Sequence, residues 1–256
     1  MNPLQKKRKR MSEKKKDSLA EMDLLAHLNE LRTRLIRSIV YIILGMTAAY
    51  IFKQKILDLV LYPIMRLNPD ISRHLVFISP TEGFLTFIRL SAYASLIFTA
   101  PLILWEFWLF AKPALYRKEQ KTSFRFFMIS LLLFYFGLFL AYILVIPYGF
   151  SFLMGFAGEQ MVPMISIREF VIFVFKVLII FGAIFETPLI LFLLSLFGII
   201  NSGMLSRLRR YVIILIFIIS ALITPPDPIT QILLAIPLVV LYEISIIVIK
   251  IGEKKN

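Results

Sequence analysis

The sequence contains no cysteine, only two histidines and relatively few charged residues. The absence of cysteine excludes disulfide bonds, thiol catalysis and cysteine-ligated metals. His27 and His74 stand far apart without the spacing of metal ligands, so no metal site is predicted. Charged residues make up 18% of the chain, hydrophobic residues make up 59%, and the mean hydropathy is +0.82. A soluble domain mixes the two kinds more evenly, so the chain is predicted to be an integral membrane protein.

Positive charge exceeds negative charge and gathers near the start of the chain. The net charge is +13, with basic runs at residues 6–10 and 14–16. Beside a membrane span, such a tail indicates cytoplasmic residues attracted to anionic lipid, rather than a nucleic-acid site. We expect residues 1–17 to form a basic, disordered tail. A charged stretch follows it instead of a short apolar core, so we expect no cleaved signal peptide.

Six apolar segments predict an all-α integral membrane protein. They cover residues 35–52, 83–110, 123–147, 170–197, 211–224 and 229–249. Each is expected to be a helix, because lipid offers backbone groups no other hydrogen-bond partner. The distribution of lysine and arginine places both termini and the loops 111–122 and 198–210 in the cytoplasm. The membrane domain is thus predicted to cover 35–250, with an amphipathic N-terminal helix at 18–34 and a cytoplasmic tail at 251–256.

Local signals refine this arrangement. Ser79 with Glu82, and Ser166 with Glu169, have capping-box spacing before the second and fourth spans. The fifth span has about 14 residues and reaches only ~21 Å, less than the ~30 Å hydrocarbon core. A short span beside longer ones predicts a concave face or a locally thinned bilayer.

Two acidic side chains stand among basic ones on the predicted cytoplasmic side. Glu30 lies four residues before Arg34, a spacing that allows an ion pair on one helix face. Glu119 lies in a loop that is rich in lysine and arginine. Taken alone, both carboxylates are explained by local charge balance on a solvated surface.

Five blocks of sequence together point to one family. They are HLNELRTRL (27–35), SPTEGFLTFIRLS (79–91), PLILWEFWLFAKPALYRKE (101–119), FGAIFETPLI (181–190) and TPPDPITQILLAIPLVVLYE (224–243). In this order they resemble the motifs of the TatC family, the polytopic receptor subunit of the twin-arginine protein translocase. The resemblance covers roughly residues 23–250. It implies six helices, cytoplasmic termini in the cell inner membrane, no enzymatic activity, no cofactor and transport driven by the proton-motive force.

The resemblance also implies a receptor surface for signal peptides that carry two consecutive arginines. Its residues are Glu30, Leu31, Arg32, Phe110, Pro113, Leu115, Tyr116 and Glu119. Arginine presents a planar fork of donors that a carboxylate accepts, whereas lysine is a point charge. We hypothesise that the two isolated carboxylates, Glu30 and Glu119, lie among basic residues and bind tightly only a peptide that reaches both of them.

Glu186 lies inside an apolar run, where a charge costs about 2.5–3.5 kcal/mol. Pro188 removes a backbone donor and predicts a bend there. One interpretation is a neutral side chain hydrogen-bonded within the bundle. The resemblance favours another, in which Glu186, Pro188 and Gln231 form a face that docks single-span TatA and TatB subunits. It also implies a homo-oligomer within a larger complex.

The remaining polar or special residues receive structural interpretations. The resemblance assigns Pro63 and Asp227 to the periplasmic side, where Asp227 also suits a helix cap. Glu106 lies between two tryptophans and is interpreted as an interfacial residue. Glu243 is expected to approach Lys250, two turns later on the same helix.

The sequence leaves two other classes of protein open. A proton-coupled secondary transporter would use Glu186 as its intramembrane coupling site. No second intramembrane acid is placed convincingly beside it in the sequence. An intramembrane hydrolase would need a nucleophile and a base within bonding reach, and the sequence offers no evident pair.

Overall fold

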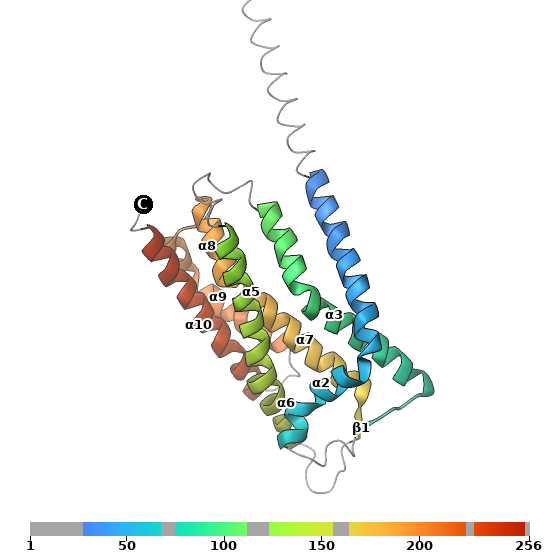
Figure 1. Cartoon of the computed structure of the whole chain (residues 1–256). Coiled ribbons are helices and arrows are strands. Elements are labelled where there is room, and N and C mark those ends of the chain that lie inside the picture. Colours follow the sequence, from blue (N-terminus) through green and yellow to red (C-terminus); the bar gives the residue numbers. More distant parts are fainter. Residues whose placement is uncertain (1–27, 68–74, 112–122, 156–163, 224–227, 254–256) are drawn as a thin grey trace, which may run out of the picture.

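The computed structural model describes residues 28–67, 75–111, 123–155, 164–223 and 228–253. The described chain is almost entirely helical (Figure 1). Its first helix, called the N-terminal helix below, covers Leu28–Ile51 and continues without a break through the predicted boundary at residue 34. The predicted basic tail, the first part of segment 18–34 and the last three residues lie outside the described residues.

The elements that follow are α2 (Lys53–Leu67), β1 (Leu75–Val76), α3 (Pro80–Ala111), α5 (Ser123–Leu140), η3 (Ala141–Val145), α6 (Ile146–Gly155), β2 (Ile165–Ser166), α7 (Ile167–Phe185), α8 (Thr187–Leu196), α9 (Ser202–Ile223) and α10 (Pro228–Glu253). The segment η3 is a short π-helix that continues α5 into α6. Figure 1 shows that the N-terminal helix begins, and α3 and α10 end, at one end of the bundle. We call this the terminal end, and the end that carries α2, α6 and β1 the opposite end.

Among the described residues, five helical stretches are long and apolar enough to cross a membrane. They are Leu28–Ile51, Pro80–Phe110, Phe124–Phe152, Ile167–Leu196 and Leu234–Glu253. Each overlaps a predicted span, so the all-α membrane architecture is confirmed. The predicted fifth span, 211–224, falls on the second half of α9, whose first half is rich in arginine. Its crossing of the membrane, and hence the count of six, stays a prediction.

Two glycines allow α5 and α7 to pack closely. A Cβ atom added to Gly137 of α5 would lie 2.8 Å from the carbonyl oxygen of Phe181 and from Cγ of Phe185. A Cβ atom added to Gly182 of α7 would lie 2.7 Å from Cε2 of Phe134. Real Cβ atoms do not approach other atoms so closely, so a larger residue would force the helices apart. This packing fixes α5 against the second half of α7.

A carboxylate ties the opposite end together. Glu82 accepts hydrogen bonds from the backbone N–H groups of Ile78 and Ser79, at 2.6 and 3.2 Å. Its other oxygen accepts the hydroxyl of Ser166, which in turn accepts the N–H of Glu169 at 3.3 Å. Both predicted helix starts are confirmed, and Glu82 also joins them across the parallel pair β1–β2. One carboxylate thus satisfies the backbone N–H groups that precede α3 and links them, through the hydroxyl of Ser166, to the start of α7.

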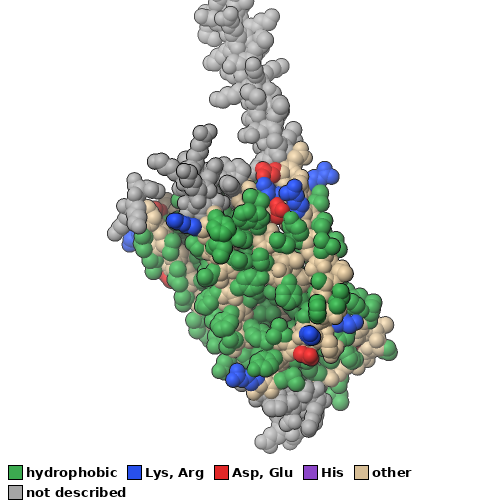
Figure 2. All heavy atoms as spheres, in the orientation of Figure 1, with side chains coloured by type: hydrophobic (Ala, Val, Ile, Leu, Met, Phe, Trp, Pro, Cys, Tyr) green, Lys and Arg blue, Asp and Glu red, His purple; other side chains and the backbone are tan. Residues whose placement is uncertain are grey.

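The surface between the two ends is hydrophobic. Figure 2 shows apolar side chains covering the middle of the visible face, with the charged ones lying toward the ends. The N-terminal helix is the least enclosed, since only 6% of its most apolar window is buried. An apolar surface of this extent suits lipid and would be unstable in water.

Candidate functional site

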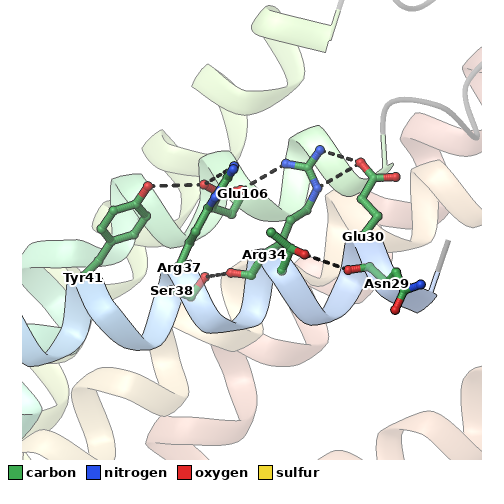
Figure 3. A network of polar contacts seen from close by, with 8 residues as sticks. Asn29, Glu30, Arg34, Arg37, Ser38, Tyr41 and Glu106 are labelled. Atoms are coloured by element: carbon green, nitrogen blue, oxygen red, sulfur yellow. Dashed lines mark hydrogen bonds and ion pairs between the residues drawn. The ribbon is translucent and has the colours of Figure 1, made fainter. Parts of the chain in front are cut away.

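A row of polar side chains on the N-terminal helix faces α3 near the terminal end (Figure 3). Glu30, Arg34, Arg37 and Tyr41 follow one another at spacings of three or four residues, which places them on one side of a helix. Glu106, from the second half of α3, meets this row. The five side chains form what we call the terminal network.

Arg34 bridges the two carboxylates of the terminal network. Its Nε and Nη2 donate to Oε1 of Glu30 at 3.1 and 2.5 Å, and its Nη1 donates to Oε2 of Glu106 at 3.0 Å. The hydroxyl of Tyr41 donates to Oε1 of Glu106 at 3.3 Å, and Nη1 of Arg37 lies 3.8 Å from that oxygen. The predicted pair of Glu30 with Arg34 is confirmed.

Burial decreases along the network from Glu106 to Glu30. The side chain of Glu106 is 6% exposed, that of Arg34 is 17% and that of Glu30 is 34%. Glu106 is thus enclosed between the N-terminal helix and α3, and its interpretation as a residue at the membrane interface stays a prediction. A buried carboxylate is costly unless it is paired and hydrogen-bonded. Glu106 meets this condition with groups from a helix about 70 residues earlier in the chain.

The other predicted receptor residues divide into two groups. On the N-terminal helix, Leu31 is half-buried and Arg32 is exposed, while Phe110 lies half-buried in the last turn of α3. Pro113, Leu115, Tyr116 and Glu119 lie outside the described residues. The proximity of Glu119 to Glu30 therefore stays a prediction.

The second polar feature is Glu186, at the junction between α7 and α8. The first of these helices ends at Phe185 and the second begins at Thr187, followed by Pro188, so the helix is interrupted where the sequence predicted a bend. Glu186 is 9% exposed, and its Oε2 accepts a hydrogen bond of 2.7 Å from the hydroxyl of Ser130 on α5. This bond agrees with the interpretation of Glu186 as a side chain bonded within the bundle.

Two buried polar atoms near this junction lack partners among the described residues. They are Oε1 of Glu186 and Nε1 of Trp108, whose side chain is 2% exposed. Trp108 belongs to a cluster with Leu189 and Leu193, which lie one and two turns after Glu186. A carboxylate oxygen and an indole N–H each usually find a partner when buried. Glu186 therefore has remaining capacity to bind a polar group.

The other residues assigned by resemblance have separate environments. The side-chain amide of Gln231 on α10 donates to the carbonyl of Phe217 on α9 at 3.0 Å, whereas Glu186 bonds to α5. Pro63 is buried within α2. Asp227 lies outside the described residues.

An apolar hollow of about 300 Å³ opens between several helices. It is lined from α2, α3, α5, η3 and α7 by side chains that include Val60, Phe98, Leu138 and Leu178. The prediction from the sequence tied a concave face to the short fifth span, in α9, which contributes no residue to this hollow. Its apolar lining suits hydrocarbon rather than a charged solute.

Comparison with known proteins identifies the family. The profile of the family described as Sec-independent protein translocase protein (TatC) matches residues 26–237. The chain belongs to the TatC family. The TatC protein of Desulforapulum autotrophicum is 38% identical over 231 residues, which cover 90% of this chain and 85% of the relative. The TatC protein of Aquifex aeolicus is also 38% identical, with 92% of this chain and 98% of the relative covered.

A solved structure agrees with this assignment. A crystal structure of the twin-arginine translocase receptor TatC matches with a TM-score of 0.80 and 38% identity, covering 89% of this chain and 99% of that one. The chain is therefore a membrane component of a Sec-independent protein translocase and not an enzyme. The resemblance recognised from the five sequence blocks is confirmed.

Several functional contacts could not be found in the sequence. Ser130 is one of several hydroxyls in apolar segments, and nothing local marks it as the partner of Glu186. The expected partner of Glu243 was wrong: Nε of Arg209, on α9, lies 2.8 Å from its carboxylate, in place of Lys250 on its own helix. An acid in an apolar helix signals that a partner exists, but packing decides which one it is.

Proposed function

We propose that this chain is the receptor subunit that captures twin-arginine signal peptides of folded precursor proteins at the cytoplasmic face of the cell inner membrane. In this proposal the terminal end faces the cytoplasm, with both chain termini, and α9 supplies the sixth membrane crossing. The receptor then recruits single-span TatA and TatB subunits and works as one of several copies in a larger complex.

The observation that carries the proposal is the environment of Glu30. It lies in the sequence block that resembles the receptor motif, at the terminal end, and its side chain is 34% exposed. It already accepts two donors of a guanidinium, that of Arg34. A carboxylate that accepts an arginine fork from its own chain has the chemistry to accept one from a peptide.

Photocrosslinking tests peptide capture directly. A crosslinking residue placed at position 30 or 119 of the full chain in membranes should capture an arginine-pair peptide. Glu30→Lys and Glu119→Lys should abolish capture from the other position, because each places a cation where the peptide arginine binds. Glu169→Lys makes the same charge change at an exposed site of the opposite end and should leave capture intact. Unchanged capture in both receptor variants would contradict the proposal.

We further propose that Glu186 docks a polar group on the transmembrane helix of a TatA or TatB subunit, with Pro188 and Gln231 on the same face. The support is the unpartnered Oε1 of Glu186 and the unpartnered Nε1 of Trp108 among the described residues. A hydrogen bond from a partner helix would satisfy a buried group that the chain itself leaves unsatisfied.

A crosslinking residue at position 186 should capture a TatA or TatB helix when these subunits are co-expressed. A matched residue at position 246, which is buried beside α9, should not. Failure at position 186 would contradict partner docking. Proton-coupled uptake of a solute by the purified chain alone in liposomes would instead support the transporter alternative.

A further inference from the structure

The guanidinium of Arg34 is hydrogen-bonded to the Glu30 carboxylate, which the proposed function assigns to the arginine pair of the signal peptide. Two of its nitrogens donate to Oε1 of Glu30, and the third donates to Oε2 of Glu106 (Figure 3). The side chains of Arg34 and Glu106 are 17% and 6% exposed, so their bond is largely shielded from water. An internal arginine thus makes the kind of bond that the receptor is proposed to make with its ligand.

We propose that Arg34 is an internal competitor for the peptide arginine and thereby sets the affinity threshold that a signal peptide must exceed. The inference rests on the proposed function, in which Glu30 binds the arginine pair. An incoming cation must replace both donors that Arg34 gives to Glu30. An arginine fork replaces both, whereas a lysine ammonium is a single compact charge. Displacing Arg34 costs the same whichever cation arrives, so the competitor weakens binding of both, and only the arginine fork regains two bonds to the carboxylate.

Glu106 allows Arg34 to release Glu30 when a peptide arginine arrives. One guanidinium nitrogen already bonds Glu106 at 3.0 Å, so Arg34 can release Glu30 and remain paired. Without Glu106, the displaced guanidinium would lie in a largely enclosed site where no other described carboxylate pairs with it, which is costly. Tyr41 and Arg37 approach the other oxygen of Glu106, at 3.3 and 3.8 Å, and hold this carboxylate in place. Glu106 is therefore a positioning residue that acts through Arg34.

Peptide titrations test the competitor. The dissociation constants of a fluorescent arginine-pair peptide and its lysine-pair counterpart are measured on the full chain in lipid nanodiscs. Arg34→Gln should tighten binding of both peptides by a similar factor, roughly three- to tenfold, because the competing donors are removed. Arg34→Lys keeps the charge but not the fork, so it competes less well and should also tighten binding of both peptides, even if the glutamine variant fails to fold. Arg125→Gln removes an exposed cation from the start of α5 and serves as the charge control.

The positioning role of Glu106 is tested in two backgrounds. Glu106→Gln alone should weaken binding of the arginine-pair peptide roughly three- to tenfold, because Glu30 is then the one acid paired with Arg34 among the described residues. In the Arg34→Gln background it should have no effect beyond that of Glu243→Gln, which removes the same charge from α10. Equal weakening with and without Arg34 would overturn this role.

The outcomes separate this inference from the proposed function. Weaker or unchanged arginine-pair binding in both Arg34 variants would show that Arg34 only orients Glu30, and the competitor would be refuted. Glu30→Gln tests the receptor assignment separately in the same titration. If that variant binds the arginine-pair peptide as the wild type does, the assignment of Glu30 fails, whatever Arg34 does.

Discussion

Adding one methyl group at Gly137 should loosen the contact that places α5 against Glu186. The new Cβ of Gly137→Ala would lie 2.8 Å from the carbonyl oxygen of Phe181 and 2.8–2.9 Å from the ring of Phe185. The carbonyl belongs to the backbone of α7 and cannot rotate away. The two helices must separate by several tenths of an ångström or more to reach ordinary contact. Ser130 lies two turns earlier on α5, so its 2.7 Å bond to Glu186 should lengthen as well.

Two opposing effects set the magnitude. Overpacking a close contact costs about 1–3 kcal/mol, and the cost at Gly137 belongs near the upper end because a backbone atom is involved. Alanine is about 1 kcal/mol more favourable than glycine within a helix. The net destabilisation is therefore about 2 kcal/mol, which corresponds to a fall in Tm of about 4–8 °C for a chain of this size.

Thermal unfolding in detergent, followed by far-ultraviolet circular dichroism at a fixed scan rate, measures this change. Gly155→Ala is the matched control, because a Cβ added at the end of α6 meets nothing within 4 Å. The Tm of this control should stay within about 1 °C of the wild-type value, since the substitution adds no overpacking. If Gly137→Ala proves as stable as the control, close packing of α5 and α7 does not hold this part of the fold.

Two further predictions concern single hydrogen bonds. Ser130→Ala should lower Tm by about 2–12 °C, because it leaves a second oxygen of Glu186 unsatisfied at about 1–3 kcal/mol. Ser245→Ala loses only a bond to the carbonyl one turn back and should lower Tm less; equal shifts would contradict the importance of the Ser130–Glu186 bond. Glu82→Gln should speed amide hydrogen exchange at Ile78 and Ser79, because the carboxylate accepts both N–H groups and the Ser166 hydroxyl. The side chain of Glu169 pairs with its exposed neighbour Arg168, so Glu169→Gln should not change exchange at these two amides. Unchanged exchange in Glu82→Gln would refute the stabilising role of the Glu82 carboxylate.

Local physical chemistry explains what could be predicted from the sequence. A backbone in lipid must satisfy its hydrogen bonds within its own helix, so long apolar runs mark helices without knowledge of their neighbours. Helix starts depend on side chains three residues apart, and the predictions at Ser79 and Ser166 were confirmed. The interruption at Glu186 followed from Pro188, two residues later. The family could also be identified, because its motifs are linear.

Only the tertiary structure decided which polar groups meet. Glu106 meets Arg34 across 72 positions of sequence, and Ser130 meets Glu186 across 56. Each partner is chosen by the distance and rotation between packed helices, which glycines such as Gly137 help to set. Sequence periodicity defines one face of one helix and carries no information about the opposing helix. The sequence therefore determined the kind of molecule and its family, and the packing determined that the Glu30 carboxylate and the Glu106 carboxylate share one arginine.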